Sequence, residues 1–536
     1  MRLSMILLLA LSCASFPKSY FFASDGADAG AGSQASPWKS SAKYKSLSLV
    51  AGDSVLFKRG SVWAAESLFI SAQGSPTHPI VFSSWGDTRD SAPHLHSPGR
   101  LVVLTRSSDL ILENLRLSGA RGGCVELWDS TNTRIVIQDI EASQCGGGVY
   151  ATGTDLVIRR NFIHDGKMVV NTPGAKGTVA GDDDYGASGI GLGQVNGCKV
   201  YSNRLENLKA TSYDYGTDGG AFEFWRTVRN CDIHSNFSRN TDGFMEFGGL
   251  KGDSVVDVSI HHNLILDAGT AGCFHMGGAG SEMGVLFDKI RFDHNLSVDR
   301  YQMPWGYHLY SDGPRLDRPE RIQVRNNIFV SDSAKFWTLD WTAPNKEPAF
   351  LHRDNLLWSP KLNPFKDGWV AGPGETFADP LFANPAWNSR PLWDTVAADY
   401  APSGSSPAVK AGQNLGYAVD YFGKSYAQGE AVDLGPFSRE GLSGFLAGRT
   451  GNSREAAVRV HGSGKGLVVE SNLEVSQPCR LRLLGLGGEV LQESESWQAP
   501  LGPSSHQVSF TANLSTLALV EVRVGPSRVV RLVALR

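Results

Sequence analysis

One short phrase decides the fold, and its clearest copy reads Ser259-Ile260-His261-His262-Asn263. An apolar run is followed by one or two polar residues and an Asn, after which a second apolar run begins. The phrase recurs with its Asn at Asn161, Asn203, Asn236, Asn263, Asn295, Asn327 and Asn355, and weaker copies end at Asn114 and Asp139. The spacings run from 22 to 42 residues. A fixed motif with variable insertions predicts a solenoid whose extra residues form loops.

Each apolar run is too short for a helix and too regular for a loop, so the repeating unit is predicted to be a coil of short strands. Stacked coils would place corresponding strands about 4.8 Å apart. We expect the recurring Asn to adopt the left-handed conformation of a tight turn and to hydrogen-bond the coils above and below. The sequence therefore predicts an all-β chain, built as a parallel β-helix with the Asn residues as scaffolding.

Two cysteines fit this pattern. Cys198 and Cys231 each lie five residues before a ladder Asn, where other coils carry Val258, Ile290 and Ile322. The simplest interpretation makes them buried stacking residues, because a free cysteine behaves as a small hydrophobe. A disulfide between adjacent coils is the alternative in an exported protein.

The beginning of the chain resembles an export signal. Arg2 is followed by an apolar stretch from Met5 to Leu11 and then by small residues, so residues 1–15 are predicted to be a signal peptide and the protein to be secreted or held at the cell surface. Cys13 would be the acylated residue of a lipoprotein, but the residues before it match that motif poorly. No apolar run is long enough to span a membrane.

Composition excludes one class of partner. The net charge is −4 and no basic block occurs, so nucleic acid is not an expected ligand. The chain contains 60 Gly, 13 Trp and 14 Tyr. This content is typical of a turn-rich β protein with exposed aromatic rings of the kind that stack on sugars.

The two ends of the solenoid region carry a family resemblance. The chain resembles the pectate-lyase-like superfamily of right-handed parallel β-helix proteins over roughly residues 20–438. The segments that carry the likeness are 20–26, 36–40 and 52–60 near the start and 405–408 and 432–436 near the end. The resemblance implies the handedness of the helix, whereas it only points towards a polysaccharide as substrate.

A separate region follows the solenoid. Residues 439–455 are predicted to be a linker, and alternating strands in residues 456–536 predict a small C-terminal β-sandwich. The strands at 481–485, 489–491 and 506–508 and the basic ending at 528–536 resemble a sorting domain of the type IX secretion pathway, which implies a secretion partner. The usual glycine-containing strand near Leu517 is missing. The alternative is an accessory domain that binds carbohydrate or caps the solenoid.

A second strand in each coil precedes the Asn strand and places one polar residue between apolar neighbours. Side chains alternate along a strand, so the middle residue points outward. The alignment predicts an outward column of Glu223, Glu246, His275 and His308 on four consecutive coils, with Glu126 and Tyr150 lower in the same column. Two carboxylates one coil apart repel each other and should raise at least one pKa. Such a column destabilises the fold, which favours a functional role over a merely solvated face.

Polar and aromatic loops lead to the same place. One loop contains Tyr213, Asp214, Tyr215 and Asp218, and another carries Asp242, directly before Glu246. A similar Asp-Tyr-Gly stretch, from Asp182 to Gly186, looks like a second lip of one cleft. We expect Glu223, Glu246, Asp218 and Asp242 to be catalytic, and the substrate-binding set to be His275, His308, Tyr213, Tyr215, Asp214, Trp225, Trp305 and Glu126.

Three functions remain open on this evidence. A glycoside hydrolase would use paired carboxyl groups as acid and as nucleophile or base. A polysaccharide lyase would use calcium held by Glu223, Glu246 and Asp242, with His275 or Tyr215 as base. Lyases of the families that this chain resembles commonly use Lys or Arg as base. The predicted column has neither, and the direction of Arg226 and Lys251 is unknown.

The absence of Lys and Arg from the column favours a hydrolase that requires no cofactor. The third possibility, a carbohydrate-binding surface protein, would not need paired acids. A monomer acting on a polysaccharide is expected in either enzymatic case.

Overall fold

The computed structural model describes residues 17–174, 183–268, 271–276, 285–299, 307–311, 319–331, 351–361, 371–384, 397–426 and 429–438, with 273–276 and 307–311 described by their backbone only. Between 457 and 534 it describes the backbone of the strands. The predicted signal peptide and Trp305 lie outside the described residues. The chain divides into two compact units, residues 1–439 and 440–536.

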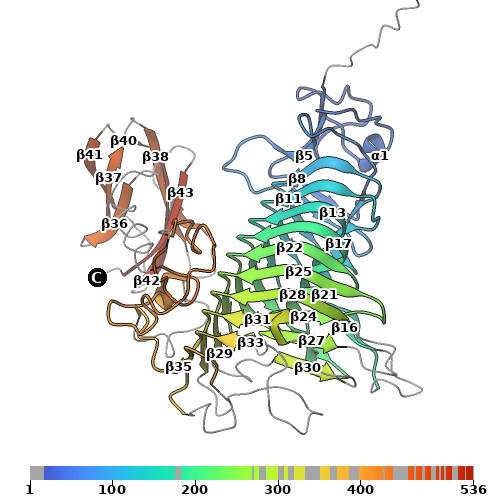
Figure 1. Cartoon of the computed structure of the whole chain (residues 1–536). Coiled ribbons are helices and arrows are strands. Elements are labelled where there is room, and N and C mark those ends of the chain that lie inside the picture. The colour runs from blue at the N-terminus through green and yellow to red at the C-terminus, as the bar shows by residue number, and fades with distance from the viewer. Residues whose placement is uncertain are drawn as a thin grey trace, which may run out of the picture. The chain divides into compact units, whose positions relative to one another are not determined.

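The first unit is a stack of coils in which strands pair in parallel with their counterparts one coil away (Figure 1). The ladder that carries the predicted column consists of β4 (Leu68–Ile70), β7 (Val102–Leu104), β10 (Gly123–Leu127), the first half of β13 (Gly147–Arg159), the first half of β17 (Ser188–Tyr201), β21 (Gly220–Trp225), β24 (Met245–Gly248), β27 (Gly272–Met276) and β30 (Tyr307–Ser311). We call it the first ladder.

The second ladder follows it in each coil. It consists of β1 (Ser19–Phe22), β2 (Ser54–Lys58), β5 (Ile80–Trp85), β8 (Ser108–Glu113), β11 (Thr133–Gln138), the second halves of β13 and β17, β22 (Val228–His234), β25 (Ser254–His261), β28 (Leu286–Asp293), β31 (Ile322–Arg325) and β33 (Leu351–Arg353). Because β13 and β17 run through both ladders, the two form one 19-stranded sheet.

The third ladder is a 12-stranded parallel sheet. It consists of β3 (Val62–Ala64), β6 (His94–His96), β9 (Arg116–Ser118), β12 (Glu141–Ser143), β14 (Phe162–His164), β18 (Arg204–Leu208), β23 (Phe237–Thr241), β26 (Leu264–Leu266), β29 (Leu296–Asp299), β32 (Ile328–Ser331), β34 (Leu356–Trp358) and β35 (Thr376–Phe377). Short helical turns lie at α1 (Ser41–Tyr44), η1 (Pro319–Arg321) and η3 (Ala397–Tyr400). No helix among the described residues is long and apolar enough to cross a membrane.

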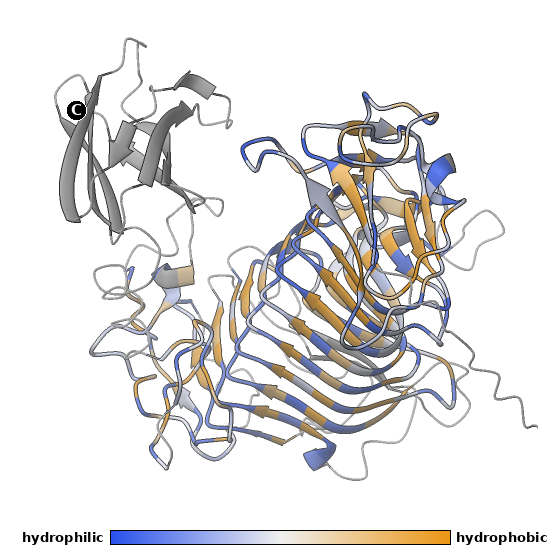
Figure 2. Ribbon diagram, turned by 90° about the horizontal axis from the view of Figure 1, so that it is seen from above, coloured by the Kyte–Doolittle hydropathy of each residue, from blue (hydrophilic) through white to orange (hydrophobic). Residues whose placement is uncertain are grey.

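The core lies inside the coils. Apolar side chains point inward at corresponding positions of successive strands, so hydrophobic segments recur from coil to coil in Figure 2. Phe224 of β21 and Phe247 of β24 are both buried and stack with their ring centroids 4.6 Å apart. Burial of these rings removes apolar surface from water, and stacked aromatic pairs add to that stabilisation. The predicted all-β parallel β-helix is confirmed.

The Asn ladder connects the coils, as predicted. The Asn203 Oδ1 accepts hydrogen bonds from the backbone N–H and the Nδ2 of Asn161, and the Asn203 Nδ2 donates to the carbonyl of Ile158. The same pattern continues along the solenoid to Asn355. These buried amides satisfy backbone groups that would otherwise have no partner.

Two details of the predicted ladder are wrong. The left-handed residue in each Asn turn is the residue before the Asn, for example Ser202 with a φ of 57° and Ser235 with a φ of 53°. Asn114 and Asp139 are themselves left-handed, with φ values of 58° and 54°. They therefore occupy that preceding position and are not members of the ladder.

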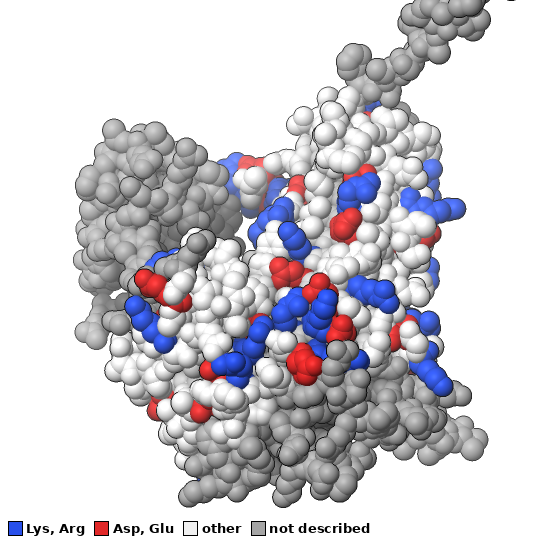
Figure 3. Space-filling view, in the orientation of Figure 1, with Lys and Arg blue, Asp and Glu red and all other residues white. Residues whose placement is uncertain are grey.

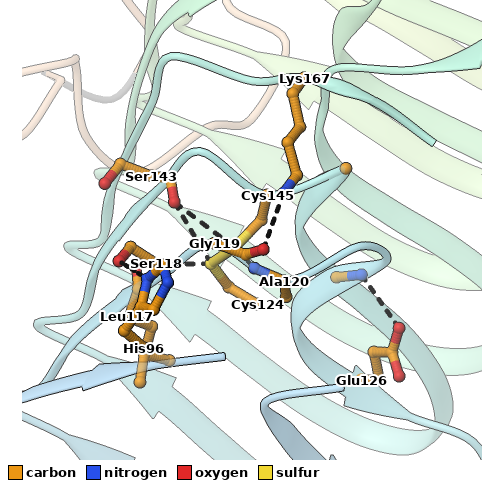
Figure 4. The surroundings of a disulfide bond; sticks show 12 residues. His96, Leu117, Ser118, Gly119, Ala120, Cys124, Glu126, Ser143, Cys145 and Lys167 are labelled. Atoms are coloured by element: carbon orange, nitrogen blue, oxygen red, sulfur yellow. Dashed lines mark hydrogen bonds between the residues drawn. A yellow bond between two sulfur atoms is a disulfide. The ribbon is translucent and has the colours of Figure 1, made fainter. Parts of the chain in front are cut away.

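Disulfides hold two pairs of neighbouring coils. Cys198 pairs with Cys231, and Cys124 pairs with Cys145. The first pair corrects the interpretation as free stacking residues, because Cys198 and Cys231 lie directly opposite each other on β17 and β22. Figure 4 shows the second pair, with Lys167 donating to the carbonyl of Gly119 beside it.

The second unit consists of two antiparallel sheets. One contains β36 (Ala457–Ser463), β37 (Gly466–Leu473) and β41 (Gly502–Ser509), and the other contains β38 (Gln477–Leu484), β39 (Val490–Glu493), β40 (Trp497–Ala499), β42 (Leu517–Val524) and β43 (Ser527–Ala534). This arrangement agrees with the predicted small β-sandwich. The predicted linker at 439–455 lies outside the described residues, and a role in sorting stays a prediction.

Candidate active site

The centre of the candidate site is a pair of glutamates on adjacent strands. Glu223 of β21 lies directly opposite Glu246 of β24 in the parallel register. The residues on either side of each glutamate are buried, whereas both glutamates are half-buried on the outer face of the coil. Strands in a sheet lie about 4.8 Å apart, so the two carboxyl groups project from neighbouring positions on one surface.

The column continues towards the N-terminus through small and aromatic residues. Gly191 lies opposite Glu223, and Tyr150 lies opposite Gly191. A side chain at Gly191 would meet the Tyr150 ring at 2.6 Å, so the glycine leaves room for that ring beside the glutamates. Burial, followed by the negative charge of Glu223, raises the pKa of Tyr150. The tyrosine is therefore a neutral hydroxyl group at physiological pH.

Glu126 lies in the column but is not an exposed site residue. It is opposite Tyr150 in register, yet it is only 3% exposed. Its oxygens accept hydrogen bonds from the backbone N–H of Gly123 at 3.0 Å, visible in Figure 4, and from Nε1 of Trp128 at 2.9 Å. The prediction that Glu126 binds substrate is corrected, because the carboxylate is enclosed and already bonded.

The predicted position of His275 is wrong by two residues. Glu246 lies opposite Cys273, and Cys273 lies opposite His308. His275 instead lies opposite Tyr310. The backbone register therefore retains His308 in the column and moves His275 along the strand. Substrate binding by either histidine stays a prediction.

Asp218 is a carboxyl group of the site whose pKa is strongly raised. It ends β20 (Gly216–Asp218), which forms a hairpin with β19 (Ala210–Ser212). The pKa of Asp218 is raised to about 7, first by burial and then by the charges of Glu246, Glu223 and Asp242, although the backbone N–H of Gly219 donates to its carboxyl group. These effects identify all four predicted catalytic carboxyl groups as electrostatic neighbours, and a carboxyl group protonated near neutral pH is suited to donate a proton.

Lys209 is a charged residue of this cluster that the sequence analysis missed. Its Nζ lies 2.9 Å from Oδ1 of Asp242, and both side chains are largely buried. The same Oδ1 accepts a hydrogen bond from the Thr217 hydroxyl at 2.8 Å. Asp242 is therefore anchored by a cation and a hydroxyl. Lys209 directly follows β18 of the third ladder, so alignment of the first ladder could not reveal it.

Two antiparallel strand pairs lie next to each other near Asp218: β15 (Met168–Val170) with β16 (Tyr185–Gly186), and β19 with β20. The Asp214 carboxylate accepts the backbone N–H of Asp184, and the Tyr215 hydroxyl donates to Asp183 at 2.9 Å. Asp184 is buried and accepts the backbone N–H of Tyr213 at 2.7 Å. The two Asp-Tyr-Gly stretches are thus neighbours. Asp214 and Asp184 support the loops, while Tyr213 and Tyr215 are 59% and 55% exposed.

Trp225 supplies an exposed ring next to the glutamates. It lies two residues after Glu223 on the same face of β21 and is 37% exposed. A side chain at Gly248 would meet the Trp225 ring at 2.1 Å, so the indole lies over the glycine that follows Glu246 by two residues. Trp225 can therefore offer a flat apolar surface to a sugar ring.

Whether the carboxyl cluster could bind a calcium ion depends on the oxygen ligands that its residues offer. In the described part of the chain, no group of three His, Cys, Asp or Glu side chains is arranged to hold a metal ion. Asp242 is paired with Lys209, and Asp218 has a pKa of about 7. Calcium requires several ionised or carbonyl oxygens directed at one point. The described residues do not fit such a site.

A separate cavity of about 500 Å³ lies on the second ladder, between β22, β25 and β28 and the segment 416–419. Its lining includes His261, whose Nε2 pairs with Asp232 and whose Nδ1 pairs with His262. Both ring nitrogens are thus engaged. Figure 3 shows basic and acidic side chains interspersed over this face. The cavity lies apart from the carboxyl cluster.

Comparison with known proteins supports the assignment of the fold. The family model of the right handed beta helix region matches residues 100–296. The chain contains a right-handed parallel β-helix. Among curated proteins, none matches this β-helix chain.

The β-helix is similar in fold to several solved structures. Pectate lyase Pel9A has a TM-score of 0.48 at 15% identity, over 79% of this chain and 97% of that one. The complex of XylC with xylose has a TM-score of 0.46 at 10% identity, over 78% and 98%. A GH136 lacto-N-biosidase from Eubacterium ramulus has a TM-score of 0.34 at 13% identity, over 67% of each chain. These likenesses concern the fold alone.

Proposed function

We propose that this protein is a secreted glycoside hydrolase that cleaves a polysaccharide at the carboxyl cluster. The observation that carries the proposal is the raised pKa of Asp218, about 7, beside the glutamate pair of adjacent coils. Hydrolysis of a glycosidic bond needs one carboxyl group that holds a proton and another that is ionised. Environments that separate two carboxyl groups in this way identify the acid and its partner.

Asp218 is the proposed general acid. Its proton passes to the oxygen of the leaving sugar as the glycosidic bond breaks. Glu223 and Glu246 supply the negative charge on the other side of the reaction, either by attacking the sugar or by removing a proton from water. The Ser188 hydroxyl donates to Oε2 of Glu223 at 3.1 Å, which fixes the direction of this carboxylate. Asp242 is the proposed assisting residue, held by Lys209 and Thr217.

A polysaccharide lyase is the second candidate, and one observation favours it. The outward column of the first ladder favours a hydrolase because it has no Lys or Arg, yet Lys209 reaches the carboxyl cluster from the third ladder. A lyase needs a base that removes the proton beside a uronate carboxylate. Lys209 donates to Asp242 in this arrangement, so it does not act as a base without first losing that partner. The hydrolase therefore has the stronger support.

Analysis of products from a panel of polysaccharides tests the proposal. The full-length protein is incubated with neutral and uronate-containing glycans, with and without a chelator. The proposal requires saturated reducing ends whose formation is unaffected by the chelator. Unsaturated uronate products would overturn the hydrolase in favour of a lyase, and their loss on chelation would indicate a calcium requirement. Retention on a glycan without new ends would indicate a binding protein.

A further inference from the structure

Trp128 is an exposed aromatic residue outside the carboxyl cluster. It directly follows β10 and is 58% exposed. Its Nε1 donates to the buried Glu126 at 2.9 Å, and the guanidinium carbon of Arg100 lies 4.7 Å from its ring centroid. An indole that is held at one edge and stacked by a cation has a fixed orientation. A large apolar ring kept in place on the surface is typical of a binding site.

Trp128 and Trp225 occupy equivalent places in their coils. Each lies two residues after the column position of its strand, Glu126 and Glu223, and therefore on the same outer face. The strand pairs β10–β13, β13–β17 and β17–β21 separate them. Three steps of about 4.8 Å place the two rings about 14 Å apart along the helix axis. An extended chain of a few pyranose rings spans this distance.

The positions between the two tryptophans carry small side chains. The intervening strands carry Thr152 and Gly193 two residues after their column positions, so no large side chain from these positions stands between the rings. In the column itself, Tyr150 lies against Gly191. A sugar chain parallel to the axis would therefore pass Thr152 and Gly193 at these positions, with an indole at each end.

We call the surface between Trp128 and Trp225 the track. Its charge determines which kind of polysaccharide can bind there. Four carboxyl groups gather at its catalytic end, where Lys209 is already paired with Asp242. At the other end, Arg100 lies 3.7 Å from the Glu126 carboxylate. A uronate would meet negative charge at the first point and a compensated cation at the second. A neutral sugar offers hydroxyl groups to the acids and an apolar face to each indole.

We propose that a neutral polysaccharide lies along the first ladder, with one sugar on Trp225 and another on Trp128. This inference rests on the proposed function and adds its substrate class and a distal subsite. Because Trp128 is three coils from Glu223, the bound chain extends well beyond the bond that is cleaved. The affinity of the protein therefore increases with chain length until Trp128 is covered.

Binding to oligosaccharides of increasing length tests the inference without requiring cleavage. The probes are xylo-, manno- and cello-oligosaccharides and, as charged counterparts, oligogalacturonates, each from disaccharide to octasaccharide. They are titrated against the full-length protein and its Trp128→Ala variant by calorimetry at low temperature. The variant should bind the longest oligomers about tenfold or more weakly, while its Kd for the shortest oligomers that bind stays unchanged. Trp128→Phe should restore part of the loss. The control is Leu286→Ala, at an exposed apolar residue of β28.

The outcomes separate this inference from the proposed function. Equal affinity of Trp128→Ala and wild type for every oligomer would overturn the inference, even if the protein cleaves glycans. An equal loss for short and long oligomers would also overturn it. Length-dependent binding through Trp128 without hydrolysis would support the track and contradict the proposed function. Tight binding of uronate oligomers alone would overturn the neutral substrate class.

Discussion

Glu223 and Glu246 lie directly opposite each other on β21 and β24, and their charges raise the pKa of Asp218 to about 7 after the larger effect of burial. Like charges opposite each other in a sheet destabilise it. This chain nevertheless places two more carboxyl groups, Asp218 and Asp242, beside the pair. Such clustering of altered titratable groups is typical of catalytic sites.

Neutralisation of either glutamate should abolish cleavage and leave the fold intact. We expect Glu223→Gln and Glu246→Gln each to lower kcat by about 10²–10⁴-fold, because an amide neither attacks nor activates water. Release of reducing ends is the measurement, with circular dichroism as the check on folding. Glu141→Gln, in the third ladder, is the control. Full activity in both site variants would contradict the assignment of the catalytic pair.

The pH profile should report the proton of Asp218. With a pKa of about 7, this carboxyl group is protonated below that pH and loses its proton above it. We therefore expect kcat/KM to fall as the pH rises through about 7. Asp218→Asn should remove this limb and lower activity on natural glycans about 10²–10⁴-fold.

An aryl glycoside with a good leaving group provides the control for Asp218. Its bond breaks without protonation, so Asp218→Asn should retain most of the activity towards it. A profile that stays flat between pH 6 and 9 on the natural glycan would show that another group supplies the proton.

Lys209 should act through charge and not as a base. Lys209→Met removes the cation 2.9 Å from Asp242, which leaves the charge of Asp242 uncompensated and raises the pKa of Asp218 further. The falling limb of kcat/KM should then move to higher pH, because a larger fraction of the Asp218 carboxyl group keeps its proton at and above pH 7. Lys209→Arg should restore the wild-type limb. Complete inactivity of both folded variants would contradict this charge role, and unsaturated products of the wild type would then make Lys209 a candidate base.

The sequence predicts the solenoid well because burial imposes it. Each coil must place apolar residues inward at the same points, and the buried amide of each ladder Asn binds the next coil, so both signals recur. The alignment also pairs Glu223 with Glu246, since the strands β21 and β24 have the same pattern of buried neighbours.

The position of His275 could not be predicted from the pattern of buried residues. A shift of two residues keeps the same side chains inward, because alternation along a strand has a period of two. The pattern therefore cannot distinguish Cys273 from His275 as the partner of Glu246, and the structure selects Cys273. Lys209 was missed for a different reason. It reaches Asp242 from the end of another ladder, and no repeat in the sequence relates the two residues.

Removal of one ladder amide should cost more stability than removal of an exposed one. Asn236 accepts hydrogen bonds from Asn203 and donates to the carbonyl of Val200 and to Asn263. We expect Asn236→Ala to lower the free energy of unfolding by about 2–5 kcal/mol, since each buried group without a partner costs about 1–3 kcal/mol. Chemical denaturation measures the change. The exposed Asn196, replaced by Ala, should change it by less than about 0.5 kcal/mol.

A stacked histidine on the second ladder should make the fold sensitive to acid. His234 lies between the rings of Tyr201 and His261, with centroid distances of 5.0 Å on both sides. Burial, followed by the positive charge of His261, lowers the pKa of His234 to about 4 from 6.5. Below pH 6.5 the His234 side chain binds a proton in the unfolded chain but not in the folded protein. The free energy of unfolding therefore decreases as the pH falls towards 4.

Replacement of this ring by phenylalanine separates stacking from titration. His234→Phe should retain the stack and show a smaller loss of Tm between pH 6.5 and pH 4 than the wild type. The exposed His78, replaced by Phe, should leave that loss unchanged. If His234→Phe lost Tm with pH as steeply as the wild type, the acid sensitivity would have to arise elsewhere, with the buried His294, whose pKa burial also lowers to about 4, as the next group to replace.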